Sequence, residues 1–256
     1  MQNLTVVKIG GAVLEDTASL KDFLLRFDAI TGNKILVHGG GRTATQLADR
    51  LGIKTQIVDG RRITDKDMLE VVIMVYGGLI NKNTVAFLQS IGCNALGITG
   101  ADLNIIRAVQ RPVGDIDYGL VGDISEINIK VLQLLLSEGF IPVIAPLTHD
   151  GLGNLLNTNA DTIAASFASA MSELFNVLLV YSFEKEGVLL DISDRQSVIP
   201  LMNRELYSKF RNENIIHSGM LPKLDNSFKA LEDGVKGVII TSSNALDLTK
   251  GTRLTL

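Results

Sequence analysis

Short apolar runs alternate along the chain with longer stretches in which apolar residues recur every three or four positions. Residues 4–9 and 35–37 are almost wholly apolar, which is typical of strands buried on both faces of a parallel sheet. Between these runs the spacing predicts a helix over residues 17–30. Its buried face would comprise Leu20, Phe23, Leu24 and Phe27. The chain therefore opens with a strand, a helix and a second strand.

The same alternation continues to residue 240. Apolar runs predict strands at residues 94–98, 140–144, 177–181 and 238–240. Helical spacing predicts helices at residues 131–137, 161–171, 203–210 and 222–231. A polar turn within residues 105–127 indicates a hairpin. This order is typical of a layered α/β fold with a mainly parallel sheet. No linker rich in Pro, Gly or Ser divides the chain, so we expect two lobes that share one sheet.

The helix predicted after Thr64-Asp65 is apolar on more than one face. Its apolar positions are Leu69, Val72, Ile73, Val75, Tyr76, Leu79 and Ile80. A helix of this kind is buried in the core or pairs with a second subunit, and both can hold at once.

Composition and charge narrow the class of protein. The chain has 256 residues, of which 46% are hydrophobic and 20% charged, with a net charge of −4. These are globular values, and the acidic balance argues against a nucleic-acid binder. The longest uncharged apolar run, residues 71–80, is shorter than the roughly 18 residues that span a bilayer. The single cysteine, Cys93, fits a reducing compartment, and we expect no leader segment because the chain opens directly into a predicted strand. We expect a cytoplasmic protein without a membrane segment.

Two glycine clusters stand at the ends of predicted strands. Gly10 and Gly11 end the first apolar run, and Gly39, Gly40 and Gly41 follow the second and precede a helical pattern. Unpaired backbone N–H groups at the start of a helix bind anions, and glycine lets an anion approach closely. Neither cluster has the spacing of a Walker loop or of a dinucleotide-binding fingerprint. The clusters predict a phosphate site of another kind.

Cationic residues accompany both clusters. Lys8 lies two residues before Gly10, near the carboxyl end of its strand, where ligands of α/β sheets bind. Lys223 follows a helix-starting Pro222, and a lysine near the positive end of a helix dipole indicates a bound anion. Arg61 and Arg62 lie in a loop, where a guanidinium group suits a carboxylate. Each of these side chains is also compatible with an ordinary solvated charge.

A polar segment from Asn157 to Asp161 precedes the helix predicted at residues 161–171. Asn and Asp are ordinary caps, but Asp161 could also accept hydrogen bonds from lysines of a phosphate site. His38, His149 and His217 have no metal-ligand spacing and Cys93 is isolated, so we expect no protein metal centre.

Five motifs occur in an order that resembles the amino acid kinase family. They are residues 8–11 (KIGG), 38–41 (HGGG), 60–64 (GRRIT), 157–161 (NTNAD) and 219–223 (GMLPK). The resemblance runs from about residue 4 to the C-terminus. It implies a three-layer αβα sandwich with a central, mainly parallel sheet. Residues 1–172 would form the lobe for the amino acid and dimerisation, and residues 173–256 the nucleotide lobe.

The resemblance is greatest to the branch of the family that phosphorylates the γ-carboxylate of N-acetyl-L-glutamate with ATP and Mg²⁺, a step of arginine biosynthesis. It implies that Lys8 and Lys223 hold the transferring phosphoryl group and contact the nucleotide. Asp161 would position the two lysines. Backbone groups of Gly10, Gly11, Gly40 and Gly41 would bind phosphate. Gly40, Gly41, Arg62 and Asn157 would bind the acyl-glutamate.

The sequence departs from the family pattern in one region. After the strand that begins the nucleotide lobe, family members carry Ser/Thr-Asp-Val, whereas this chain has Ser182-Phe183-Glu184. Only Lys185 is assigned to the nucleotide there. Arginine-inhibited members carry an N-terminal helix that joins dimers into hexamers. Leu4 already begins the first strand, so we expect a homodimer that arginine does not inhibit.

Other interpretations stay open at this point. The acyl group could be succinyl instead of acetyl. The acceptor could be that of another family enzyme, such as glutamate 5-kinase or UMP kinase. A non-catalytic sensor of a small anion would belong to a different class of protein. Binding of an anion alone, however, would not need two lysines at the phosphate site.

Overall fold

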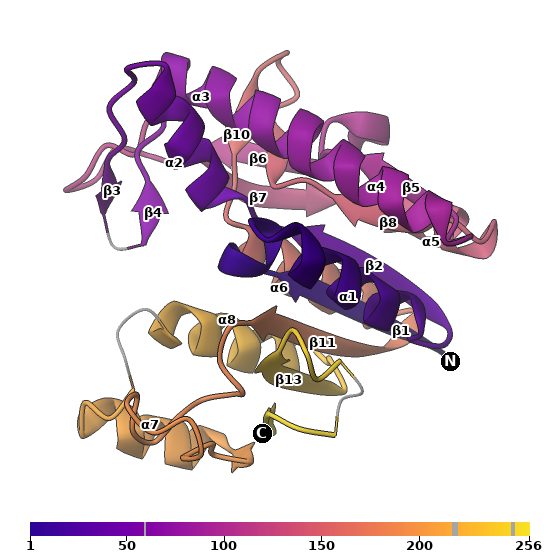
Figure 1. The fold of residues 1–256 in the computed structure, drawn as a ribbon, viewed down its shortest axis with the longest axis vertical. Coiled ribbons are helices and arrows are strands. Elements are labelled where there is room, and N and C mark those ends of the chain that lie inside the picture. Colours follow the sequence, from indigo (N-terminus) through magenta and orange to yellow (C-terminus); the bar gives the residue numbers. More distant parts are fainter. Residues whose placement is uncertain (59, 217–219, 247–248) are drawn as a thin grey trace. The chain divides into compact units, whose positions relative to one another are not determined.

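The computed structural model describes residues 1–58, 60–216, 220–246 and 249–256. The chain forms two compact units, of which the first comprises Met1–Lys34 and Ala164–Leu256, and the second Ile35–Ile163. Figure 1 shows the course of the chain through both units. The lobes expected from the sequence, residues 1–172 and 173–256, were defined by the ligands they would bind, and that assignment stays a prediction.

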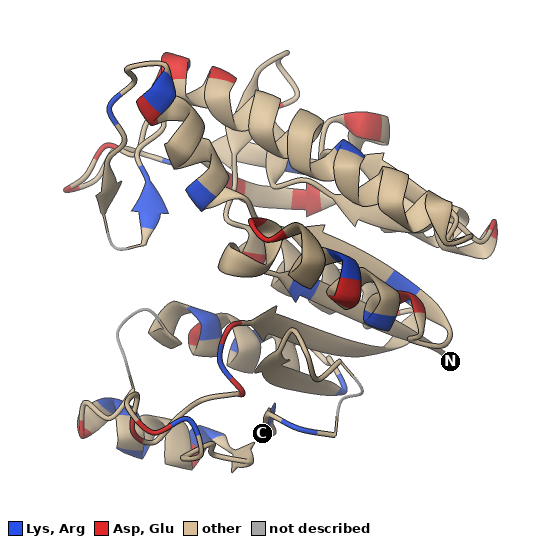
Figure 2. Ribbon diagram, in the orientation of Figure 1, with Lys and Arg blue, Asp and Glu red and all other residues tan. Residues whose placement is uncertain are grey.

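The first unit is built on parallel strands β1 (Gln2–Ile9), β11 (Phe175–Phe183) and β13 (Gly237–Ser242). Strand β11 pairs in parallel with both of its neighbours. The sheet continues beyond β13 to β14 (Thr252–Leu254), which is antiparallel to it, and then to β12 (Leu201–Met202). Every residue of β13 is buried, and Figure 2 shows β11 and β13 without charged positions. Burial on both faces explains the continuous apolar runs.

Helices α1 (Thr17–Asp28), α7 (Arg204–Asn212) and α8 (Leu221–Glu232) belong to the same unit. Helix α1 buries Phe23, Leu24 and Phe27, three residues of the predicted face, whereas Leu20 is partly exposed. Its cap is Asp16, whose carboxylate accepts a hydrogen bond from the Ser19 N–H at 2.7 Å. The α1 boundaries are close to the predicted ones because helix spacing and an N-terminal cap agree.

The second unit contains the parallel strands β2 (Asn33–His38), β8 (Ile141–Ile144) and β5 (Ala95–Ile98). A separate four-stranded sheet has the order β10-β9-β6-β7. Its strands are β6 (Ile106–Gln110), β7 (Gly122–Ile127), β9 (Leu147–His149) and β10 (Leu155–Asn157). The pair β6–β7 is the predicted hairpin, whereas the apolar pattern did not indicate the short strands β9 and β10.

Short helices and a two-stranded hairpin complete this unit. Helix α2 (Gly41–Arg50) follows β2, and α5 (Ile129–Ser137) follows β7. The hairpin consists of β3 (Ile57–Val58) and β4 (Arg61–Arg62). Helix α6 (Ala160–Met171) begins in the second unit and continues into the first.

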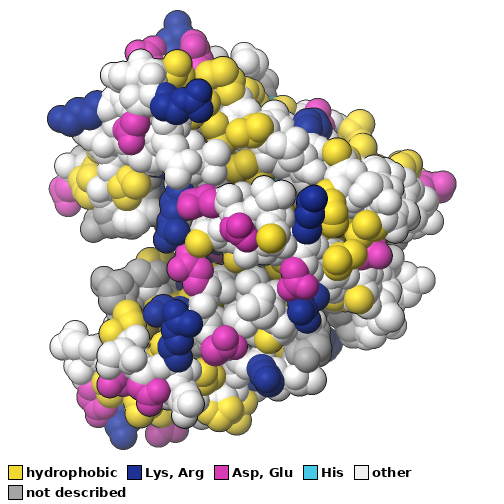
Figure 3. All heavy atoms as spheres, viewed as in Figure 1, with side chains coloured by type: hydrophobic (Ala, Val, Ile, Leu, Met, Phe, Trp, Pro, Cys, Tyr) yellow, Lys and Arg dark blue, Asp and Glu magenta, His cyan; other side chains and the backbone are white. Residues whose placement is uncertain are grey.

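One continuous helix of 25 residues, Lys66–Ser90, carries the apolar segment at residues 71–80. It comprises α3 (Lys66–Val72), the π-helical segment η2 (Ile73–Ile80) and α4 (Asn81–Ser90), with the expected cap at Asp65. By length and composition it could cross a membrane, yet 44% of its most apolar window is buried inside the molecule. Met74 and Leu79 are exposed, and apolar side chains gather along this helix (Figure 3). One face of this helix therefore packs in the core, and another apolar face is exposed.

These elements confirm the fold class expected from the sequence, a mixed α/β fold with a large, mainly parallel sheet. Cys93 is buried, as is common for a free cysteine.

Candidate active site

Lys8 and the Gly10-Gly11 loop meet at the carboxyl end of β1. The Gly10 N–H donates to the Ser182 carbonyl oxygen at 3.2 Å, so the loop is held against the end of β11. A Cβ atom on Gly10 would lie 2.9 Å from the Lys8 Nζ. The ammonium group therefore lies directly against the Gly10 backbone, and a Cβ there would make the Lys8 side chain shift. Gly11 has a φ of +43° and begins the 3-10 helix η1 (Gly11–Leu14).

Lys223 reaches the same strand end from the first turn of α8. Its Nζ lies 4.9 Å from the centroid of the Tyr181 ring and 5.7 Å from that of Phe183. Tyr181 is the register partner of Lys8 in the β1–β11 pair. Two lysines from distant parts of the sequence thus lie at one strand end of the first unit. Their combined charge, beside a glycine loop, suits a phosphoryl group.

Glu184 lies over the glycine loop from the turn after β11. Its Oε1 accepts from the Ala12 N–H at 3.3 Å and would lie 3.3 Å from a Cβ on Gly11. The Glu184 carboxylate thus occupies the start of η1, where backbone N–H groups attract negative charge. Lys185 follows in the same turn with its side chain partly exposed.

The second glycine cluster starts α2 in the second unit. Gly40 is the N-cap residue, and no side chain caps the helix. Its φ is +151°, and a Cβ there would lie 2.5 Å from the Ile80 Cδ1 and 2.8 Å from the Tyr76 ring. Tyr76 and Ile80 belong to η2. The close approach to this helix, together with the backbone conformation, requires glycine at position 40.

Arg62 is fixed against the α2 start by its own hydrogen bonds. Its Nη2 donates to the Gly41 carbonyl oxygen at 2.7 Å and to the Thr45 Oγ1 at 2.8 Å. Its Nη1 donates to the Thr55 Oγ1 at 3.4 Å. The side chain is buried. The guanidinium group is thus held in one orientation beside the glycine cluster.

Asn157 joins the same network through Thr64. The Asn157 Nδ2 donates to the Thr64 Oγ1 at 2.9 Å, and the Thr64 hydroxyl donates to the Arg62 carbonyl oxygen at 3.2 Å. All of these groups are buried. The structure therefore brings together three predicted substrate residues, Gly41, Arg62 and Asn157, through hydrogen bonds within the second unit.

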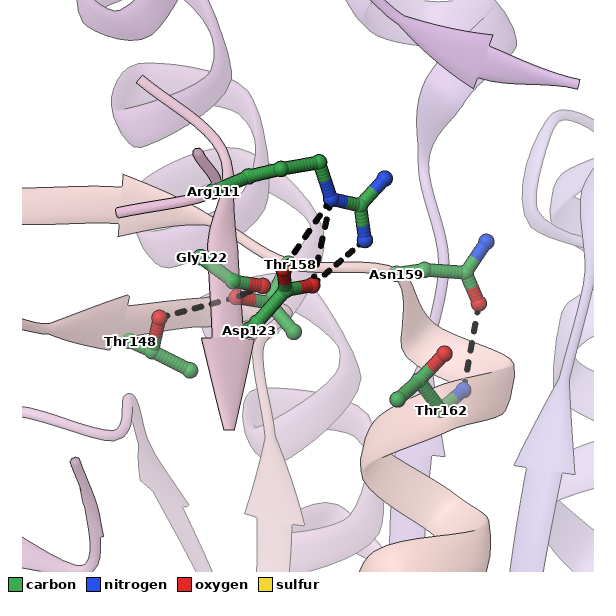
Figure 4. Close-up of polar contacts among 7 residues, drawn as sticks. All are labelled: Arg111, Gly122, Asp123, Thr148, Thr158, Asn159 and Thr162. Atoms are coloured by element: carbon green, nitrogen blue, oxygen red, sulfur yellow. Dashed lines mark hydrogen bonds and ion pairs between the residues drawn. The ribbon is translucent and has the colours of Figure 1, made fainter. Parts of the chain in front are cut away.

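Asp161 lies in the first turn of α6. The Asn159 Oδ1 caps this helix, accepting from the N–H groups of Asp161 at 2.8 Å and Thr162 at 3.1 Å. The preceding Thr158 Oγ1 bonds the Thr148 Oγ1 at 2.8 Å (Figure 4). These contacts fix the backbone of Asp161. Asp161 belongs to the second unit and Lys8 and Lys223 to the first, so its positioning role stays a prediction.

His38 has a structural role that its sequence position did not reveal. The ring is fully buried, with Nδ1 donating to the Gly39 carbonyl oxygen at 2.8 Å and Nε2 accepting from the Asn81 Nδ2 at 3.1 Å. Burial lowers the pKa of His38 to about 4. The neutral imidazole therefore links the glycine cluster to α4.

Sequence reasoning missed several supporting residues. Thr45, Thr64 and Asn81 orient predicted residues, and Tyr181 contacts Lys223. Such side chains carry no signal of their own, since single Thr, Asn or Tyr residues are common in any fold. Of the motif at residues 219–223, Gly219 lies outside the described residues.

Comparisons with known proteins agree with this geometry. The model of the amino acid kinase family matches residues 3–242. The chain belongs to the amino acid kinase family, and it is a kinase. It is 54% identical over 251 residues to the acetylglutamate kinase of Phocaeicola vulgatus, with 98% of each chain covered. It is 54% identical to that of Bacteroides thetaiotaomicron, covering 99% of this chain and 98% of the relative. A solved structure, smu.665 from Streptococcus mutans, matches with a TM-score of 0.81, 28% identity and 98% coverage of both chains.

Proposed function

We propose that the chain transfers the γ-phosphoryl group of MgATP to the γ-carboxylate of an N-acyl-L-glutamate. The product is an acyl phosphate, and the step belongs to arginine biosynthesis. N-acetyl-L-glutamate is the acceptor that the names of the relatives give. One observation carries the proposal. Lys8 and Lys223 lie at the same strand end, beside a glycine loop, in a chain that matches acetylglutamate kinases along 98% of its length.

The reaction requires the protein mainly to position the two reactants and to supply positive charge. A glutamate carboxylate has an unperturbed pKa of about 4.3 and is ionised at neutral pH. It therefore attacks phosphorus without a general base. Charge develops on the oxygens of the transferring group, and fixed cations and backbone N–H groups stabilise it.

Residues of the first unit would hold the nucleotide's phosphates. Lys8 and Lys223 would neutralise the transferring group and the bridging oxygen to ADP, and the N–H of Gly11, in the loop that Gly10 begins, would bind its oxygens. Lys185 would contact the nucleotide. Magnesium would enter as part of MgATP. Among the described residues there is no group of three or more His, Cys, Asp or Glu side chains that could hold a metal ion.

Residues of the second unit would hold the acceptor. Arg62 would bind the α-carboxylate, since its guanidinium group is already oriented by Gly41 and Thr45. Asn157 would bind near the acyl amide. The N–H groups of Gly40 and Gly41 would lie against the γ-carboxylate and the incoming phosphoryl group. Asp161 would hold the two lysines in place.

We also propose a cytoplasmic homodimer that binds neither nucleic acid nor membrane. The support is the exposed apolar face of the long helix, which includes Met74 and Leu79, because such faces mark interfaces.

A coupled ADP-release assay tests the function. Purified protein would be given ATP, Mg²⁺ and, in separate reactions, N-acetylglutamate, N-succinylglutamate, glutamate or UMP. We expect ADP with an N-acylated glutamate only. Turnover of free glutamate or UMP instead would assign the chain to another activity of the family, and no ADP from any acceptor would favour an anion sensor.

A further inference from the structure

His38 ends strand β2, directly before the second glycine cluster, and the proposed chemistry does not use its side chain. The ring is fully buried. Its Nδ1 lies 2.8 Å from the Gly39 carbonyl oxygen, and its Nε2 lies 3.1 Å from the Asn81 Nδ2. A buried imidazole with both ring nitrogens engaged is held in one orientation. The polar contacts of His38 therefore join the glycine cluster to the start of α4.

Asn81 determines which ring nitrogen of His38 carries the proton. Besides its contact with His38, the Asn81 Nδ2 donates to the Val143 carbonyl oxygen at 2.9 Å. A carbonyl oxygen only accepts, so the amide nitrogen faces it, and the second amide hydrogen is available to the His38 Nε2. Burial lowers the pKa of His38 to about 4, so at neutral pH the ring carries a single proton. The Nε2 atom therefore accepts, and Nδ1 carries the proton and donates to Gly39.

The Gly39 carbonyl oxygen belongs to the same peptide group as the Gly40 N–H. In a planar trans peptide these two groups point in opposite directions. The hydrogen bond from His38 to the carbonyl oxygen therefore turns the Gly40 N–H away from the imidazole ring. Gly40 is the N-cap residue of α2, and no side chain caps this helix. The donor that His38 orients thus lies at a helix start, where backbone N–H groups bind anions.

This peptide needs a restraint because it joins two glycines. Glycine populates positive and negative φ about equally, and the φ of Gly40 is +151°. Packing holds the Gly40 Cα, since a Cβ there would lie 2.5 Å from the Ile80 Cδ1 and 2.8 Å from the Tyr76 Cδ1. Contact at the Cα alone does not fix the rotation of the preceding peptide. The hydrogen bond from His38 supplies that restraint.

We propose that His38, held by Asn81, is a positioning residue that aims the Gly40 N–H at the γ-carboxylate and the transferring phosphoryl group. The inference rests on the proposed function, which places this N–H beside those groups. The imidazole itself would neither touch the substrate nor move a proton. A donor that is oriented in advance stabilises developing charge better than one that must turn during the reaction. The contribution of His38 should therefore be larger in the transition state than in the bound ground state.

Two variants of similar shape test the inference by ADP release with N-acetyl-L-glutamate. In His38→Asn the amide nitrogen can take the place of Nδ1 and donate to the Gly39 carbonyl oxygen, whereas His38→Leu has no donor. Both variants lack the Nε2 atom. We expect kcat of His38→Leu to be at least about tenfold below that of His38→Asn, because a misdirected N–H loses part of what an oxyanion donor contributes. KM for ATP should agree within about twofold. Equal kcat values in the two variants would overturn the proposal.

His149 provides the matched control for the same two substitutions. Its Nε2 lies 2.7 Å from the Asn104 Oδ1, so it is also a hydrogen-bonded histidine, but it lies on β9 and not beside the glycine cluster. We expect His149→Asn and His149→Leu to have the same kcat. Thermal melts of all four variants set the assay temperature well below each melting temperature, so that unfolded protein does not affect the comparison.

Nitrogen-15 NMR of the imidazole rings tests the inference on the unaltered chain, whether or not the variants fold. We expect His38 at pH 7 to carry its proton on Nδ1, with Nε2 unprotonated. A proton on Nε2, or on both nitrogens, would overturn the proposal, because the bond to the Gly39 carbonyl oxygen or the contact with Asn81 would then differ from the one inferred.

The outcomes separate this inference from the function on which it rests. ADP release by the unaltered protein, together with equal kcat in His38→Asn and His38→Leu, would overturn the inference and keep the function. No ADP from the unaltered protein with any N-acyl-glutamate would remove both.

Discussion

The Lys223 ammonium group lies 4.9 Å from the centroid of the Tyr181 ring. Tyr181 is also the register partner of Lys8. One residue of β11 therefore lies beside both lysines, which are far apart in the sequence. Strand pairing between β1 and β11 and the first turn of α8 together create this arrangement. The proposed phosphate site depends on it.

Removal of either lysine should lower turnover strongly. Lys8→Ala and Lys223→Ala each delete a cation that would stabilise the transition state, and we expect kcat to fall at least about a hundredfold. The measurement is ADP release at saturating ATP and acyl-glutamate. Lys229→Ala, an exposed lysine on the same helix as Lys223, should keep normal turnover. Near-normal kcat in either of the first two variants would contradict the assigned roles.

Gly40→Ala should destabilise the protein. The added Cβ would lie 2.5 Å from the Ile80 Cδ1, at a φ of +151° that L-residues rarely adopt. We expect a loss of about 1–3 kcal/mol in the free energy of unfolding, as for strained backbone or an overpacked core. Urea denaturation measures it. Gly78→Ala has open space for the Cβ and should change stability by less than about 1 kcal/mol. Equal stability of the two variants would contradict the close approach at Gly40.

Thr64→Val should weaken binding of the acceptor. The variant keeps the shape of the side chain but removes the acceptor of the Asn157 amide. An unpaired buried donor costs about 1–3 kcal/mol, and Asn157 would lose its fixed orientation. We expect KM for the acyl-glutamate to rise at least about fivefold, with a smaller change in KM for ATP. Thr17→Val, at an exposed position, is the control. An unchanged KM for the acyl-glutamate would show that Asn157 does not bind this substrate.

Stability should decrease below neutral pH because of His38. The folded-state pKa is about 4, and the unfolded-state value is about 6.5. Between these values the unfolded chain binds the extra proton, so stability falls as pH drops from about 6.5 to about 4 and is unaffected by this group above that window. The difference corresponds to about 3 kcal/mol. Urea unfolding at pH 7 and pH 5 measures how steeply the free energy of unfolding depends on pH. The variant His38→Asn should reduce this dependence. An identical slope in both proteins would contradict the buried neutral histidine.

Much of the fold could be predicted because the spacing of apolar residues along the sequence matches the burial of the elements that they form. The continuous apolar runs marked β1, β11 and β13, and the Asp65 cap marked the start of the long helix. The π-helical geometry of η2 was not predictable, since no residue pattern distinguishes it from an α-helix. Strands β9 and β10 were missed because three residues are too short to show a period.

The candidate site was predictable where glycine and charge coincide. Lys8, Gly10 and Arg62 stood out by their types and neighbours. The contact between Lys223 and Tyr181 could not be predicted, because it depends on the register of β1 with β11. The pairing of Arg111 with Asp123 likewise depends on the β6–β7 hairpin.

Trapping of the acyl phosphate tests the central claim most directly. Purified protein would be incubated with MgATP, hydroxylamine and either N-acetyl-L-glutamate or N-succinyl-L-glutamate, and the hydroxamate and ADP would be quantified together. We expect hydroxamate and ADP in equal amounts with at least one of the two acceptors, and little of either with Lys8→Ala. ADP without hydroxamate, or no product with either acceptor, would contradict phosphorylation of an N-acyl-glutamate carboxylate.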